Sequence, residues 1–492
     1  MNKKIIKLFT ILTLSVTSCS DWLDVKPQTM EPVSSMFDTY QGYKNALTGC
    51  YIKMKSRSLW GEYLTFTTVE FLAQHWELPN NSSAAAIIAT AIKSHEYDDE
   101  NVQVRFQNIY RGLYNIIVQA NTIIEAMPQT GETAISDPLA RGVIEGEAYA
   151  IRALCHFEVL RLFGQVPGGS IKVRLPYTED VSREPVSYYE YEDYVNKIEH
   201  DLNRAAELLE KYDPFVTYTN SEINSLSQFD EYLHYRKLRL NYWAVKALQA
   251  RFYLYVGYKS QAAAAANEVI EAANYDKGFG LYGTMDIVGN KYYALPSEGL
   301  FTLSNHQLND YIPSLLCAPL VPANVNLHMS IARIEELFVE QYGTSSNNRW
   351  GVWLYRVASH TTEYVFELLK YDQQDPAALP VLALTSKQIM PMLRLSEMYL
   401  IAMETADNLN RINQLYATYQ IDRNILPVDF TNMEEVMQMI EKEYRREFFG
   451  EGQMFAYYKR HNATSMLWAD KAIKETDFIV PLPDTEYDPN FK

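Results

Sequence analysis

Apolar residues recur at helical spacing on more than one side of the segment 143–167. Ala150, Leu154 and Phe157 widen the stripe onto a second side, as expected for a helix packed between two neighbours. Gly164 and Pro167 supply a C-terminal stop. The first side of this helix of about six turns carries Ile144, Ala148, Ile151, Cys155, Val159 and Leu162 at steps of three and four. The pattern predicts a buried central helix.

The same spacing predicts further helices at 38–55, 101–127, 188–211 and 241–274. In the last segment, Gly257-Tyr258 marks the bend of a helical hairpin, and small residues such as Ala250 allow close approach. This arrangement is typical of tetratricopeptide repeats, although no exact period of about 34 residues is present. We therefore expect an all-α scaffold of divergent helical pairs.

Helical periodicity weakens in two stretches, 56–100 and 275–386. Glycine and proline interrupt the second stretch, where only short periodic pieces such as 331–342 remain. Helical order resumes at Pro391 with MLRLSEMYLIAMETA. A connection as long as 275–386 inside a compact protein is usually functional or forms a small subdomain, so we expect one or the other there.

The N-terminus has the features of an export signal. Lys3, Lys4 and Lys7 surround or precede an apolar run, and no acidic residue occurs among the first eighteen. The run is too short for a retained membrane span. Val16-Thr17-Ser18-Cys19 resembles a bacterial lipobox, which predicts acylation of Cys19 and a lipid anchor. The alternative is an ordinary signal peptide that happens to end in a cysteine.

The net charge limits the partners that the protein can bind, and the number of cysteines limits their chemistry. The chain carries a net charge of −17, and removing the three signal lysines leaves −20, which disfavours nucleic acid as a partner. After Cys19 an odd number of cysteines remains, Cys50, Cys155 and Cys317, which suggests small buried hydrophobic residues rather than disulfides or metal ligands.

Known catalytic motifs are missing from the sequence. It contains no H-E-x-x-H pair, no G-x-S-x-G elbow and no phosphate-binding glycine loop, so no motif indicates a metal or other cofactor, and we expect none. Carboxylates from distant segments could still pair for glycoside hydrolysis. For Glu443, Arg445, Arg446 and Glu447 we expect ion pairs on helix surfaces and between repeats, and Arg152 and Arg394 have the same structural interpretation.

Several motifs, in order along the chain, resemble the SusD/RagB family of outer-membrane nutrient-binding lipoproteins. They are GEAYAIRALCHFEVLRLFGQVP at 146–167, YRGLYNIIVQANTII around Asn121, RLSEMYLIAMETA from Arg394, IEKEYRREFFGEG from Ile440, and the closing FIVPLPDTEYDPN. Gln453 and Tyr457 depart from the family pattern, as does the segment after Ala406.

The resemblance implies a SusD-like fold, with a tetratricopeptide-like scaffold and a large loop-rich insertion. After a signal peptide at 1–18, a single domain would span 19–492. It would comprise an N-terminal helical part at 19–274 with a binding loop at about 56–100, the insertion at 275–386 and a C-terminal helical part at 387–492. The implied function is non-catalytic capture of an oligosaccharide outside the cell and its delivery to a SusC-like TonB-dependent transporter, on which the outer-membrane lipoprotein sits as a lid.

Sugar binding needs flat aromatic faces with polar groups beside them. From the two irregular regions we predict ligand contacts by Trp60, Trp76, Glu77, Tyr282, Tyr292, Arg349, Trp350 and Trp353. Each tryptophan could instead anchor the core. A peptide-binding member of the same family, a surface glycosidase and a structural or adhesive lipoprotein remain open alternatives.

Overall fold

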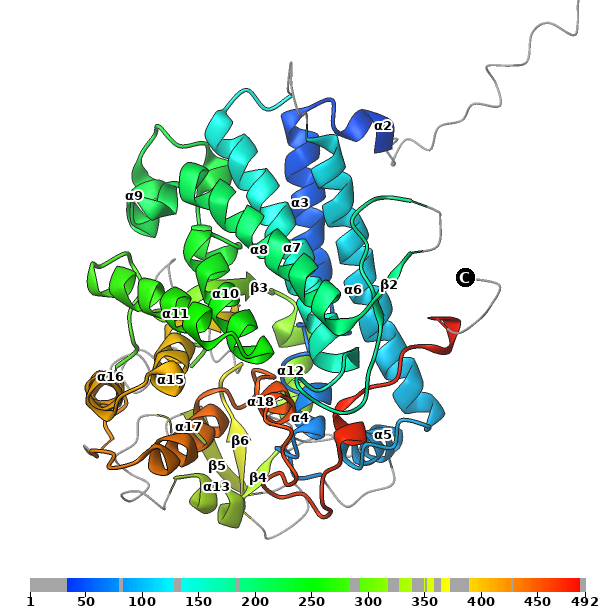
Figure 1. Ribbon diagram of the computed structural model, residues 1–492, viewed down its shortest axis with the longest axis vertical. Helices are drawn as coiled ribbons and strands as arrows, with labels where there is room; N and C mark the ends of the chain where they lie inside the picture. The colour runs from blue at the N-terminus through cyan, green and yellow to red at the C-terminus, as the bar shows by residue number, and fades with distance from the viewer. Residues whose placement is uncertain are drawn as a thin grey trace, which may run out of the picture.

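A computed structural model describes residues 33–78, 83–127, 134–182, 186–283, 293–316, 327–338, 349, 352–357, 364–371, 389–425 and 428–486 of the 492. The described chain is mainly helical, with long helices in the upper part of the view in Figure 1 and a small sheet together with shorter helices in the lower part. None of its helices has both the length and the apolar character needed to cross a bilayer.

The N-terminal half consists of long helices, joined in part by long connections such as those between Phe163 and Tyr191 and between Tyr212 and Tyr242. Helices α6, α7 and α8 pack side by side, and α10 pairs with α11 (Figure 1). Its elements are α2 (Val33–Met36), α3 (Tyr40–Met54), α4 (Thr68–Leu72), α5 (Ala84–Lys93), α6 (Glu100–Ala126), α7 (Pro138–Phe163), β1 (Leu175–Pro176), β2 (Tyr188–Tyr189), α8 (Tyr191–Tyr212), η1 (Pro214–Val216), α9 (Asn220–Ser225), η2 (Glu231–Leu233), η3 (Arg236–Leu238), α10 (Tyr242–Val256) and α11 (Lys259–Asn274). The predicted helices are confirmed within a few residues at each end.

Local sequence signals set the ends of these helices. The Asp99 side chain accepts hydrogen bonds from the backbone N–H groups of Asn101 and Val102 at the start of α6. Asp137 caps α7, whose first residue is Pro138. Gly257 adopts a left-handed φ of 90° between α10 and α11, as the expected hairpin bend requires.

The central helix α7 is buried along almost its whole length, as its two-sided apolar pattern predicts. Its C-terminal carbonyl groups find partners in the last part of the chain. Lys459 Nζ donates to the carbonyl oxygens of Leu162 at 3.2 Å and Gly164 at 2.6 Å, and the Val480 N–H also reaches Leu162. These donors satisfy carbonyl groups that the end of a helix leaves without intrahelical partners, while burial, and then Arg161, hold the pKa of Lys459 well below its ordinary value.

The second half contains the sheets. Strand β3 (Gly299–Ser304) pairs antiparallel with β7 (Ile389–Arg394), and β4 (Met329–Ser330), β6 (Tyr364–Leu368) and β5 (Trp353–Val357) form a sheet in the order β4-β6-β5. Two helices, α12 (Leu308–Leu316) and α13 (Ile331–Phe338), lie between these strands in sequence. The expectation of helix from Pro391 is corrected, since residues up to Arg394 are strand and α15 (Leu395–Thr405) begins only after them.

The C-terminal helices are α16 (Leu409–Asp422), α17 (Met433–Glu447) and α18 (Met454–Arg460), followed by η8 (Glu475–Phe478) and η9 (Asp484–Glu486). The expected block from Ile440 onward is split between α17 and α18. Gly450 and Gly452 break it with φ values of 74° and 70°. A Cβ on Gly452 would lie 2.2 Å from the Leu64 carbonyl oxygen, so only glycine fits there.

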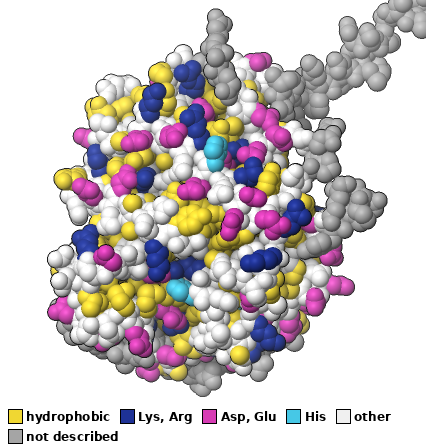
Figure 2. Space-filling view, in the orientation of Figure 1, with side chains coloured by type: hydrophobic (Ala, Val, Ile, Leu, Met, Phe, Trp, Pro, Cys, Tyr) yellow, Lys and Arg dark blue, Asp and Glu magenta, His cyan; other side chains and the backbone are white. Residues whose placement is uncertain are grey.

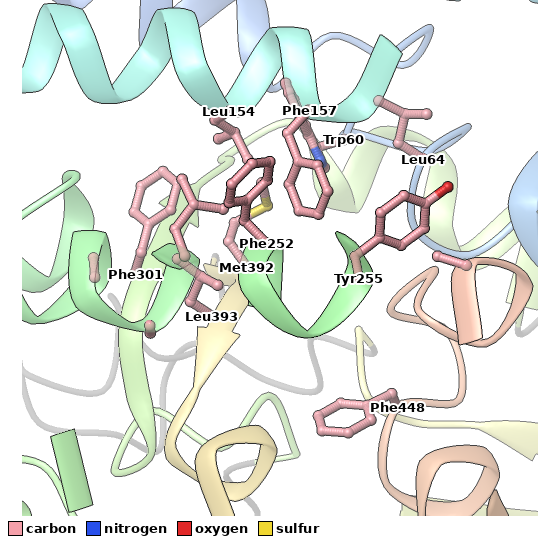
Figure 3. Packing of buried hydrophobic residues seen from close by; sticks show 14 of the residues in the cluster. Trp60, Leu64, Leu154, Phe157, Phe252, Tyr255, Phe301, Met392, Leu393 and Phe448 are labelled. Atoms are coloured by element: carbon pink, nitrogen blue, oxygen red, sulfur yellow. The ribbon is translucent and has the colours of Figure 1, made fainter. Parts of the chain in front are cut away.

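One continuous hydrophobic cluster joins the two halves (Figure 3). Phe157 of α7 makes edge contacts with Phe252 and Tyr255 of α10, at centroid distances of 5.4 and 5.5 Å. Phe301 of β3 and Leu393 of β7 enter the same cluster. Cys50 and Cys155 are buried free thiols, which confirms their predicted role as small core residues, and Cys317 lies outside the described residues.

Candidate ligand-binding site

Two predicted tryptophans come together in a buried aromatic cluster. Trp76 and Trp353 both contact Phe449, with ring centroids 4.8 and 5.0 Å apart, and they lie 6.4 Å from each other. Trp76 is fully buried and its Nε1–H donates to the Phe66 carbonyl at 2.8 Å. Trp60 is also buried, in the main core beside Phe157 (Figure 3). Such burial is what the core-anchor alternative expects, and a ligand would reach these rings only if covering segments moved.

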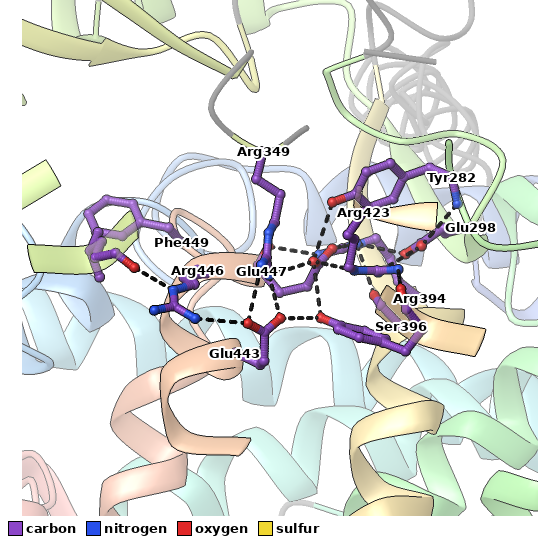
Figure 4. A network of polar contacts seen from close by, with 12 residues as sticks. Tyr282, Glu298, Arg349, Arg394, Ser396, Arg423, Glu443, Arg446, Glu447 and Phe449 are labelled. Atoms are coloured by element: carbon purple, nitrogen blue, oxygen red, sulfur yellow. Dashed lines mark hydrogen bonds and ion pairs between the residues drawn. The ribbon is translucent and has the colours of Figure 1, made fainter. Parts of the chain in front are cut away.

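Tyr282 and Arg349 meet in a buried network of ionic groups (Figure 4). The Arg349 guanidinium donates to Glu443 at 2.5 Å, and the Tyr282 hydroxyl donates to Glu447 at 3.4 Å. Arg394 and Arg423 also bind Glu447, at 2.7 and 3.0 Å. These side chains are buried, each at most 3% exposed.

The buried carboxylates stay ionised because cations surround them. Burial by itself would raise the pKa of Glu443, but Arg349 and Arg446 outweigh it and lower that pKa to about 2. Burial opposes ionisation of Glu447 too, yet Arg423 and Arg394 hold its pKa well below the usual range. Unpaired, such charges would carry a large desolvation cost.

This network fastens the insertion to the C-terminal helices. Its members come from the segment before β3 (Glu298), the end of β7 (Arg394), the end of α16 (Arg423) and α17 (Glu443 and Glu447). The prediction that Arg394, Glu443, Arg446 and Glu447 form structural ion pairs is confirmed, although the pairs are buried rather than on helix surfaces. Arg152 likewise pairs with buried Asp201 at 2.6 Å.

Glu77 differs from the other described candidates because it is half-buried at a solvent-exposed margin. It forms an isolated bridge with His328, and its carboxylate accepts a hydrogen bond from the Ser330 backbone N–H. The other carboxylate oxygen pairs with Arg333 Nε of α13 at 3.3 Å. The first irregular region and the insertion therefore meet at Glu77.

Trp468, from a third segment of the chain, packs against Arg333 beside Glu77. The Arg333 guanidinium lies 4.8 Å from the centroid of the Trp468 ring, and the Trp468 indole N–H donates to exposed Glu336 at 2.6 Å. Trp468 has a left-handed φ of 65° and stays partly exposed. We call Glu77, Arg333, Glu336 and Trp468 the rim cluster.

Lys93 holds the backbone beside the rim cluster in place. Its ammonium donates to the Trp76 carbonyl at 2.8 Å, which fixes the backbone next to Glu77. Burial, and then the nearby Arg333, lower the pKa of Lys93 to about 8. The amine is therefore mostly protonated at neutral pH, and the hydrogen bond keeps its donor.

The sequence reasoning found Glu77 but missed Arg333, Glu336 and Trp468. Trp468 lies outside the two irregular regions, in a short stretch without helical period after α18. The one signal in the sequence that could have indicated this site is the occurrence of a tryptophan in such a loop. Tyr292, Trp350 and Cys19 lie outside the described residues, and the described part holds no group of three or more His, Cys, Asp or Glu arranged for a metal.

Comparison with known families gives two matches that together cover most of the chain. Residues 21–254 match a family described as starch-binding and associating with the outer membrane, and residues 241–488 match the SusD family.

Curated relatives match over a shorter segment. SusD-like proteins P25 and P2 of Formosa agariphila are 24% and 28% identical to this chain over 161 residues, 32% of its length. The chain spans 30% of the length of these two relatives.

Solved structures share the fold over nearly the whole chain. SusD superfamily proteins of Bacteroides thetaiotaomicron and Bacteroides vulgatus give TM-scores of 0.67 and 0.68 at 21% and 18% identity, covering 92% of this chain and 98% of theirs. A laminarin-binding SusD-like protein gives 0.65 at 19% identity, covering 92% of this chain and 97% of its own. The helical scaffold expected from the sequence is thus a SusD-type fold.

Proposed function

Since this chain belongs to the SusD family, we propose that it binds an oligosaccharide without cleaving it and delivers it to a SusC-like TonB-dependent transporter of the outer membrane. An acylated Cys19 would hold it there, facing the cell exterior. The laminarin-binding neighbour of the same fold supports a glycan as the ligand rather than a peptide.

The observation that carries the ligand proposal is the rim cluster. The Trp468 indole is held at its nitrogen by the hydrogen bond to Glu336 and on its ring by the Arg333 guanidinium. The exposed part of the ring therefore has a fixed orientation. A rigid aromatic face can stack on the C–H surface of a sugar, and neighbouring carboxylate oxygens can accept hydroxyl hydrogen bonds. Glu336 is exposed and placed to do so.

In this proposal the buried candidate residues do not contact the ligand themselves. Trp76 and Trp353 pack beneath the segment that bears Glu77, and Tyr282 and Arg349 hold the insertion in place. They would stabilise the surface that the ligand contacts. Tyr292 and Trp350 stay predicted ligand contacts from the insertion.

The test is glycan retention by the unacylated mature chain, with Trp468→Ala as the key variant. We expect binding to at least one neutral glycan, such as laminarin or a starch oligosaccharide, and about a tenfold or greater loss on removal of the indole. Tyr275→Ala is the matched control, because Tyr275 is an exposed aromatic residue, 73% accessible, at the end of α11.

Three results would count against the proposal. Full glycan retention by a folded Trp468→Ala variant would show that the rim cluster does not bind the ligand. Release of shorter sugars by the pure protein would indicate a glycosidase. Binding of peptides in place of all glycans tested would indicate the other ligand class of the family.

A further inference from the structure

The long connection between α8 and α10 carries an exposed aromatic residue in an unusual backbone conformation. Tyr235 has a left-handed φ of 54° and its side chain is 54% exposed. This region of backbone space is sterically unfavourable for a bulky residue. Such strain persists only where the surrounding structure imposes it, and strained residues concentrate at functional sites. An exposed tyrosine that keeps this conformation is therefore a candidate contact residue.

Hydrogen bonds on both sides of Tyr235 fix its backbone. The Tyr235 N–H donates to Asn224 Oδ1 at 2.7 Å, and the Tyr235 carbonyl oxygen accepts from the Leu238 N–H at 2.8 Å. The chain beside it is tied to the insertion, because the Lys237 ammonium donates to the Pro296 carbonyl oxygen at 2.9 Å. The ring of Tyr235 therefore projects from a backbone that is held in place.

Tyr235 shares its conformation with Trp468 of the rim cluster. Trp468 has a φ of 65° and is also partly exposed. Within the described ranges, these two are the only Phe, Tyr or Trp residues with a positive φ. Asparagine, aspartate and glycine adopt this conformation far more readily. Backbone geometry alone therefore does not account for an aromatic side chain at either position.

A run of polar residues lies beside Tyr235. Asn224, whose side chain holds the Tyr235 N–H, begins the run NSLSQ at 224–228, and the last four side chains of this run are exposed. Leu226 among them is 37% exposed. An aromatic ring and an apolar side chain can contact the C–H surface of a sugar, while hydroxyl and amide groups beside them bond to its hydroxyl groups. We call residues 224–228 together with Tyr235 the Tyr235 surface.

The charged groups near the Tyr235 surface favour a neutral sugar over an acidic one. Exposed Glu222 and Glu231 flank the polar run in sequence, and residues 212–235 include no Lys or Arg. Lys237 and Lys277, which approach this connection, donate to backbone carbonyl oxygens. Figure 2 shows side chains of both charges scattered over the face that it draws, so a stretch without cations is a local property. A uronate or a sulfated sugar would be repelled here.

We infer that the Tyr235 surface is a second contact for the neutral glycan of the proposed function, on which this inference rests. Helix α9, which ends in the polar run, lies at the upper left of Figure 1, and α13, which bears Arg333 and Glu336 of the rim cluster, lies at the bottom. The two contacts are therefore separate, and only a long glycan chain can occupy both. Two linked contacts retain such a chain more strongly than either does alone, because the second forms at a high effective concentration.

Affinity electrophoresis of the full mature chain, in gels that contain laminarin or starch, tests the second contact. We expect Tyr235→Ala to lower retention by the polysaccharide about tenfold and to leave the affinity for a short oligosaccharide of the same sugar unchanged. Trp468→Ala should keep a weak retention that the double variant Trp468→Ala, Tyr235→Ala loses. Tyr275→Ala should migrate like the unmodified chain, because Tyr275 is 73% exposed but has an ordinary φ of −93°.

Two further substitutions separate binding from a structural role of the ring. Asparagine accepts the left-handed backbone more readily than tyrosine, so Tyr235→Asn should melt no lower than the unmodified chain. It should still lose polysaccharide retention as Tyr235→Ala does, whereas Tyr235→Phe, which keeps the ring, should hold most of it. A clearly lower melting temperature of Tyr235→Asn would show that the ring serves the fold and would overturn the inference.

Nitration of exposed tyrosines, located by peptide mass spectrometry, gives a readout at the residue itself. Bound polysaccharide should protect Tyr235 and leave Tyr275 reactive. Equal nitration of Tyr235 with and without polysaccharide, or retention unchanged by Tyr235→Ala, would overturn the second contact while the rim cluster and the proposed function stand. Retention by the acidic polysaccharide alginate that Tyr235→Ala abolishes would overturn the neutral class of ligand. If no glycan retains the unmodified chain, the proposed function and the second contact fail together.

Discussion

Arg394 shows how many ion pairs a single side chain of the buried ionic network can make. Its guanidinium donates to Glu298, Glu447 and Glu451 at 2.7–2.9 Å and is 1% exposed. A neutral side chain could not reproduce these three ion pairs.

We predict that Arg394→Met lowers the free energy of unfolding by about 3–5 kcal/mol, because three buried carboxylates would lose a shared cation. Arg174→Met is the matched control, since Arg174 and its partner Glu190 are 60% and 64% exposed and such a pair contributes about 0–1 kcal/mol. Urea denaturation of both variants measures the difference. Equal stabilities would show that the network contributes little to the fold.

At the scale of elements, the junction between α17 and α18 depends on glycine. Gly452 combines a positive φ with close approach to the Leu64 backbone, and its N–H donates to buried Glu70 at 2.8 Å. The turn therefore connects the C-terminal helices to the first irregular region.

Gly452→Ala should destabilise the protein by more than about 1 kcal/mol, because the added methyl group meets backbone in a conformation that alanine disfavours. Gly280→Ala provides the comparison, as nothing lies within 4 Å of its Cβ position. Thermal unfolding should separate the two clearly, and a neutral Gly452→Ala would mean that the turn can relax.

The sequence predicted the long helices because their two-sided or one-sided apolar patterns persist over several turns, as in α6 and α7. It missed β7 because IMPMLRL is a short apolar run that periodicity cannot assign, and its partner β3 lies almost ninety residues earlier. Similarly, composition could not decide whether Trp76 is buried. The rim cluster depends on three segments whose meeting only tertiary structure reveals.

At the scale of the whole molecule, acid stability follows from the buried carboxylates. The pKa values of Glu443 and Glu404 are lowered to about 2, in both cases by cations that outweigh burial. In the unfolded chain a glutamate has a pKa of about 4.3, so these groups stabilise the fold fully above that pH and progressively less as the pH falls toward 2.

The melting temperature should therefore decline between about pH 4.5 and 2, and the slope should be shallower in Glu443→Gln. That variant should already be less stable at pH 7, since Arg349 and Arg446 lose their carboxylate. Calorimetry across this range provides the test. A slope unchanged by the substitution would place the acid sensitivity elsewhere in the chain.

The contact of Val480 and Lys459 with the end of α7 also constrains how the molecule is made. The closing residues contact a helix that is completed about 300 residues earlier in the chain. The carbonyl groups of Leu162 and Gly164 therefore gain these donors only when nearly the whole chain is present. A chain that ends near position 450 would lack both Lys459 and Val480, so we expect it to fold less stably than the full-length chain.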